Sequence, residues 1–133
     1  MATAALEGAR AELHARCDTI EECYEYMLAY AAQGNVGEGG QIRSFVTRAD
    51  EAITALVAFT AKAGDQFTGA DAPYAAFMGV TGADARASQA AVRLVLAQPA
   101  ITSQMIDNLN ASIHLRALLT DLFLLDEALK RPS

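Results

Sequence analysis

Leucines recur at steps of three and four residues near the C-terminus of the chain. The series is Leu115, Leu118, Leu122, Leu125 and Leu129. This spacing places all five side chains on one face of a helix. A second apolar stripe lies roughly opposite, formed by Met105, Leu109, Ile113, Leu119, Phe123 and Leu124. Because one stripe is enough to close the protein's own core, we expect the other to contact a partner, and we interpret the leucine stripe as the interface.

Four helical stretches are predicted along the chain, over residues 3–33, 41–63, 72–97 and 99–130. In the first, Leu6, Leu13, Ile20 and Met27 are seven residues apart, which is typical of a helix with a continuous apolar seam. A capping box at Asp18 or Thr19 would instead divide this stretch in two. The glycine-rich segment 34–40 and the segment from Gly64 to Pro73 are expected to be breaks.

The predicted fold is all-α, an up-and-down antiparallel four-helix bundle formed as a single domain by residues 1–133. The four stretches are long, and the breaks between them are short enough to reverse the chain direction. We expect the third helix to be kinked or split near Gly79 and Gly82. Helical arrays and dimers of long hairpins are the alternative architectures.

Composition narrows the classes of partner. The 133 residues carry a net charge of −6, 53% are hydrophobic, and the mean hydropathy is +0.17. The negative charge argues against nucleic acid or anionic lipid as a partner, and no apolar run is long enough to cross a membrane. With no recognisable signal sequence, we expect a cytoplasmic protein whose Cys17 and Cys23 stay reduced. The apolar excess favours a homodimer or another protein partner.

Polar residues interrupt the second apolar stripe at one-turn intervals. Asn108, Ser112 and Arg116 follow one another at steps of four, and His114 lies nearby. Polar groups on an apolar face need hydrogen-bond partners. This pattern predicts a pocket between the first and last helices, in which Arg116 holds an anionic group and Glu21 or Glu22 contributes from the first helix. An ordinary structural ion pair is the alternative for Arg116.

The first helix offers two further candidates. Tyr26 and Tyr30 are one turn apart and stand off the apolar seam, which suggests a docking surface for a partner. His14, Cys17 and Glu21 have a spacing that permits a shared metal ion, although a solvated helix face explains the same residues more simply. The paired motif of a di-iron bundle, a haem attachment motif and a glycine-rich phosphate loop are all missing.

These patterns rank the function classes. We expect a non-enzymatic helical protein that acts by self-association and protein–protein interaction, as an adaptor or regulator. The alternative is a protein, enzymatic or not, that binds a small ligand or cofactor in a pocket between the first and last helices. A metal-binding bundle is the weaker alternative. The sequence specifies no particular cofactor.

Overall fold

The computed structural model describes residues 3–37 and 40–130, and the described residues form helices and connections without a strand. The helices are α1 (Thr3–Ala31), α2 (Gln41–Ala61), α3 (Ala63–Gln66), the 3₁₀ helix η1 (Gly69–Asp71), α4 (Ala72–Leu96), α5 (Ser103–Ala111) and α6 (His114–Leu129). The all-α fold class is thereby confirmed.

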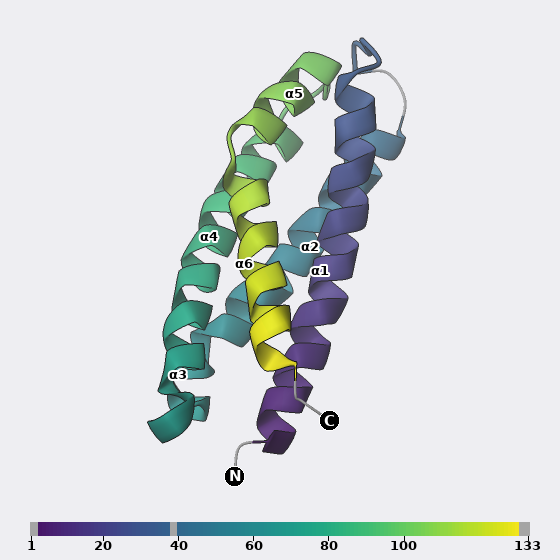
Figure 1. Ribbon diagram of the computed structural model, residues 1–133. Coiled ribbons are helices and arrows are strands. Elements are labelled where there is room, and N and C mark those ends of the chain that lie inside the picture. Colours follow the sequence, from purple (N-terminus) through teal and green to yellow (C-terminus); the bar gives the residue numbers. More distant parts are fainter. Residues whose placement is uncertain (1–2, 38–39, 131–133) are drawn as a thin grey trace.

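The long helices pack side by side around one core. In Figure 1, α1 and α4 lie on opposite sides, α6 lies in front and α2 lies behind. α1 contacts α2, α5 and α6, and α4 contacts α2, α3, α5 and α6. The predicted seam of α1 faces inward, since Leu6, Leu13, Ile20 and Met27 are all buried. Burial of these side chains supplies most of the driving force that holds the helices together.

The first helix is continuous, so the alternative division near Asp18 is excluded. After it, the chain turns through Gly34 and Gly37, whose φ angles are +68° and +96°. Gly37 also passes close to the connection between α4 and α5, where a Cβ atom on it would lie 2.7 Å from Cβ of Ala100. Only glycine meets both the backbone conformation and the close approach at this position.

The third predicted helix was expected to be kinked or split, and the prediction of a split is wrong. α4 is one helix from Ala72 to Leu96 and includes both Gly79 and Gly82. Gly82 is buried, and a Cβ atom there would lie 2.6 Å from Oγ1 of Thr60 on α2. The glycine therefore allows α4 to approach α2 closely and does not end the helix.

The last predicted helix, in contrast, is interrupted. α5 ends at Ala111 and α6 begins at His114, and between them Ile113 has a φ angle of +66°. A β-branched residue rarely adopts this left-handed conformation, so the break stores backbone strain. The segment 64–73, expected to be a plain break, contains most of α3 and all of η1.

The leucine stripe was predicted to be an interface, and the structure corrects that prediction. All five leucines are buried, with at most 2% of any of them exposed. α6 turns this face toward α1 and α4, so the chain covers its own stripe. From the opposite set, Leu109 and Leu119 are also buried, whereas Ile113, Phe123 and Leu124 are about half exposed. The amphipathic stripes were correctly identified, but the stripe that faces outward was not.

Single substitutions at two adjacent residues of α6, a leucine and a phenylalanine, test this orientation of the helix. Leu122 is 1% exposed and Phe123 is 48% exposed. We expect Leu122→Ala to lower the free energy of unfolding by about 2–5 kcal/mol because it opens a cavity. Phe123→Ala should cost about 1 kcal/mol or less. Urea denaturation followed by circular dichroism measures both, and equal losses would contradict this orientation.

The strain at Ile113 gives a second prediction. Asparagine tolerates a positive φ angle better than a β-branched residue, so Ile113→Asn should raise the free energy of unfolding by about 0.5–1 kcal/mol. The matched variant Ile113→Val keeps the β-branch and should give no gain. The same denaturation measurement compares them. A less stable Ile113→Asn protein would show that contacts of the isoleucine side chain outweigh the strain.

Candidate functional site

The predicted ligand-binding residues are dispersed over the surface. Arg116 lines a groove between α1 and the α5–α6 break, whereas Asn108 and Ser112 line a different groove between α4 and α5. His114 is exposed and lines neither groove. Glu22 forms an ion pair with Arg48 on α2. A single pocket that unites all these residues is therefore not formed, because the break at Ile113 rotates the end of α5 relative to α6.

The α4–α5 groove is almost wholly apolar. It has a volume of about 320 Å³ and is lined by Ala91, Leu94, Val95, Gln98, Met105, Asn108, Leu109 and Ser112. No charged side chain is among these residues. Leu94 stands at its edge with 67% of its surface exposed, the largest exposed fraction among the large hydrophobic residues within the described helices. Such a combination of a groove and a protruding apolar side chain favours a macromolecular contact.

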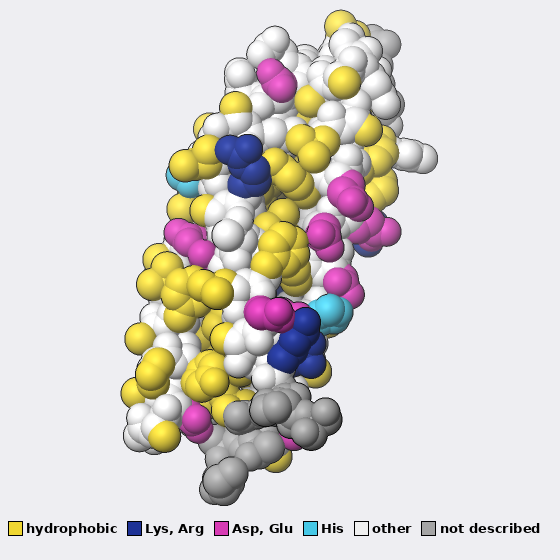
Figure 2. All heavy atoms as spheres, in the orientation of Figure 1, with side chains coloured by type: hydrophobic (Ala, Val, Ile, Leu, Met, Phe, Trp, Pro, Cys, Tyr) yellow, Lys and Arg dark blue, Asp and Glu magenta, His cyan; other side chains and the backbone are white. Residues whose placement is uncertain are grey.

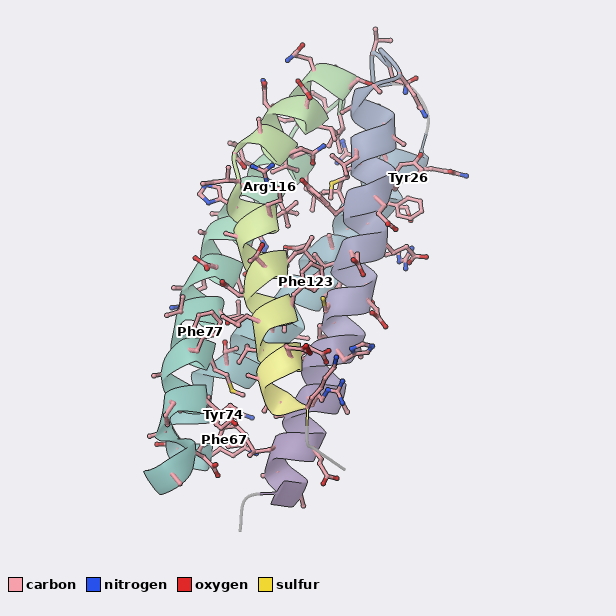
Figure 3. All side chains as sticks on the ribbon, in the orientation of Figure 1. Tyr26, Phe67, Tyr74, Phe77, Arg116 and Phe123 are labelled. Atoms are coloured by element: carbon pink, nitrogen blue, oxygen red, sulfur yellow. The ribbon has the colours of Figure 1, made fainter. Side chains whose placement is uncertain are left out.

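The α1–α5 groove has a different chemistry. It also has a volume of about 320 Å³, and its lining consists of Tyr24, Leu28, Ala31, Ala32, Asp107, Asn110, Ala111 and Arg116. Arg116 belongs to the first turn of α6 and Asp107 to α5, so two opposite charges border one small hollow. Figure 3 shows Arg116 near the start of α6, beside the junction with α5. Asn110 and Asp107 were not among the residues selected from the sequence.

A third groove lies along the first half of α1. It has a volume of about 730 Å³, and Arg10, His14 and Asp18 line it. Asp126 on α6 accepts a hydrogen bond of 3.0 Å from Nε of Arg10 and lies 3.3 Å from Nδ1 of His14. The hydrogen bond from Arg10, opposed by partial burial, lowers the pKa of Asp126. These groups pair with one another, so they link α1 to α6 by a hydrogen-bonded ion pair.

The metal candidates do not form a ligand set. Cys17 is buried, whereas His14 is exposed and pairs with Asp18 and Asp126. Burial, together with the charges of nearby carboxylates, raises the pKa of Cys17 to about 12, which disfavours the thiolate that a metal requires. Within residues 3–37 and 40–130, no three histidine, cysteine or acidic side chains are arranged to hold a metal ion.

The predicted tyrosine docking surface also needs correction. Tyr30 is only 5% exposed, and its hydroxyl donates a 2.6 Å hydrogen bond to the carbonyl of Ile101. Tyr26 is half-buried and stacks on Phe45 of α2, with ring centroids 4.0 Å apart. In Figure 3, Tyr26 lies on the side of α1 away from α6. Tyr30 is therefore a structural residue, and Tyr26 packs against α2.

Two carboxyl groups meet between α4 and α6. Asp84 lies beside Asp121, and partial burial together with the neighbouring Asp84 carboxyl raises the pKa of Asp121 to about 7. The Oδ2 atom of Asp121 has no hydrogen-bond partner in the described part of the chain. The pair was not predicted from the sequence, because the residues are far apart along the chain. The only sequence signal for the pair is that Asp121 directly precedes Leu122 of the leucine stripe.

Comparisons with known proteins identify no relative: no family model, curated protein or solved structure matches the chain. Across the described residues, the helices are too short or too polar to cross a membrane.

The two aspartates of α6 should respond to pH with opposite signs. Asp121 holds its proton up to about pH 7 in the folded protein, while its ordinary pKa is 3.8. The folded state therefore binds more protons between these values, and its stability falls as the pH rises through that window. We expect Asp121→Asn to raise the free energy of unfolding at pH 8 by about 1–2 kcal/mol, allowing for screening by solvent, with little effect near pH 4.

Asp126→Asn is the matched contrast. The pKa of Asp126 is lowered, so its contribution is present above the ordinary value of 3.8 and is lost as the pH falls below it. This variant should be less stable than the native protein at pH 8. Urea denaturation between pH 4 and pH 8 measures both variants, and effects of the same sign at pH 8 would contradict these opposite roles of Asp121 and Asp126.

Proposed function

We propose that this protein acts by self-association, through the α4–α5 groove and Leu94 beside it. The observation that carries the proposal is the exposure of Leu94 at the edge of a groove without charged lining residues. Removal of this apolar surface from water is favourable by about 25 cal/mol per Å². The proposal moves the interface from the leucine stripe to a surface that the chain leaves uncovered, and it assigns no reaction to the protein.

Charge restricts where a second copy of the same chain can bind. With a net charge of −6, two copies repel each other across most of their surface. Figure 2 shows acidic side chains along α1, whereas apolar side chains gather over α4 and α6. A groove without charged side chains avoids the cost of bringing like charges together.

The shape of the surface agrees with a two-fold arrangement. The groove and its exposed lining residue Leu94 lie on one face, so a two-fold axis can place the groove of one copy against that of the other, with Leu94 of each in contact with the partner's groove. Gln98, Asn108 and Ser112 give the groove an uncharged polar rim able to make hydrogen bonds across the interface. Asn108 and Ser112, predicted to contact a small ligand, would then contact the second copy.

For the fold we propose an up-and-down four-helix bundle in which α5 and α6 together form the fourth member. The contacts of α1 with α2, of α2 with α4, of α4 with α6 and of α6 with α1 support this arrangement. In such a bundle, the break at Ile113 turns the α5 portion so that its groove with α4 stays open.

Two matched substitutions on α4 test the proposed interface. Val80 lies 14 residues before Leu94, on nearly the same side of the helix and about 21 Å away along its axis. Val80 is 48% exposed, so both positions accept a charge without unfolding the helix. We expect the native protein to dimerise at micromolar concentration, Leu94→Glu to weaken the dimer at least about tenfold, and Val80→Glu to change it little.

Analytical ultracentrifugation gives the dissociation constants of the three proteins, and circular dichroism confirms that each remains helical. A native protein that stays monomeric up to about 100 µM would overturn the proposal. Equal weakening by Leu94→Glu and Val80→Glu would place the interface elsewhere on α4 and would also overturn it.

A further inference from the structure

We propose that the α1–α5 groove is a binding site for a small zwitterion, namely a free α-amino acid with an aliphatic side chain. In this assignment, Arg116 holds the carboxylate and Asp107 holds the ammonium group. The groove is separate from the α4–α5 groove, and no residue lines both. The inference therefore does not depend on self-association.

The first argument is that two opposite charges border this groove without neutralising each other. Arg116 and Asp107 both line it, yet no ion pair or side-chain hydrogen bond joins them to each other or to other described residues. Elsewhere the helices do pair such groups, as Arg10 does with Asp126. A molecule that carries both charges at short separation complements the two side chains at once.

The position of Arg116 strengthens the carboxylate end of the site. Arg116 lies in the first turn of α6, a helix of 16 residues. Ile113, the residue just before this helix, provides no side-chain cap. The first N–H groups of a helix carry a partial positive charge that favours anions. A carboxylate bound by the guanidinium there gains from both sources of positive potential.

Asn110 is the buried polar residue of this groove. It lines the groove, is only 9% exposed, and donates from Nδ2 to the carbonyl of Met27 at 3.4 Å. Its Oδ1 atom has no hydrogen-bond partner in the described part of the chain, and less than 1 Å² of this atom is accessible to solvent. A buried acceptor without a donor is costly, so this end of α5 carries a local polar cost. Because this acceptor is closed to solvent, it does not meet a ligand in the groove, and the amino group is assigned to Asp107 alone, whose negative charge favours a zwitterion over a simple anion.

Size and lining define the rest of the ligand. A volume of about 320 Å³ lies at the lower end of the range for small-molecule sites, which suits an amino acid. The α1 wall consists of Tyr24, Leu28, Ala31 and Ala32, and Leu28 is 48% exposed. An aliphatic side chain placed against this wall would cover apolar surface that now faces water.

Titration of the intact ¹⁵N-labelled protein with L-valine tests the site, followed by amide chemical shifts in two-dimensional NMR spectra. We expect saturable shifts centred on Asn110 and Arg116. N-acetyl-L-valine lacks the ammonium group and isobutylamine lacks the carboxylate, so each should bind at least about tenfold more weakly. Both analogues keep the branched side chain and serve as matched probes.

Three variants complete the experiment. Arg116→Gln and Asp107→Asn replace exposed side chains, so the spectra should retain the native fold while the affinity for L-valine drops at least about tenfold. Arg86→Gln is the control, because Arg86 is also exposed and lies outside the groove; it should bind as the native protein does. Absence of saturable shifts, equal binding of the analogues, or unchanged affinity in both groove variants would overturn the proposal.

Discussion

The arrangement of the helices depends on a small hydrogen-bonded junction at one end of the molecule. The hydroxyl of Tyr30, near the end of α1, donates a hydrogen bond to the carbonyl of Ile101. The hydroxyl of Ser103 donates one to the carbonyl of Tyr30, and both bonds are 2.6 Å long. Asn35 exchanges two more hydrogen bonds with Ser103. These contacts satisfy buried polar groups where α1 ends, and they fix the start of α5 against α1. Without them, neither groove beside α5 would have a defined wall.

Once this junction fixes α5 against α1, the chain needs a turn before α6 can pack on α1 and α4. That turn falls at Ile113, in a backbone conformation that isoleucine rarely adopts. Neither glycine nor proline marks the position, so the apolar periodicity through residues 99–130 predicted one unbroken helix. The break is imposed by tertiary packing, and it is also what opens the hollow between Asp107 and Arg116.

The sequence predicted the local features well and the long-range ones poorly. The seven-residue spacing from Leu6 to Met27 was sufficient to identify α1 and its buried face, because that pattern is a property of one segment. The leucine stripe was recognised too, but which face of α6 is covered depends on where α1 and α4 lie. Arg116 was identified as a candidate from its place on an apolar face. Asp107 and Asn110 joined it only when the structure placed α5 against α1.

α6 is held to its two neighbours by carboxyl groups in opposite states. Asp126 ties it to α1 through Arg10 and is most favourable when ionised. Asp121 lies beside Asp84 on α4, and it is most favourable when it is protonated, because burial and the neighbouring carboxyl raise its pKa. Ionisation of Asp121 places two negative charges side by side, so the contact between α4 and α6 weakens toward pH 7. The contact between α6 and α1 keeps its ion pair over the same range. Arg116 lies on the same helix. Its groove is bordered by α1, and the contact between α6 and α1 is the one that keeps its ion pair at neutral pH.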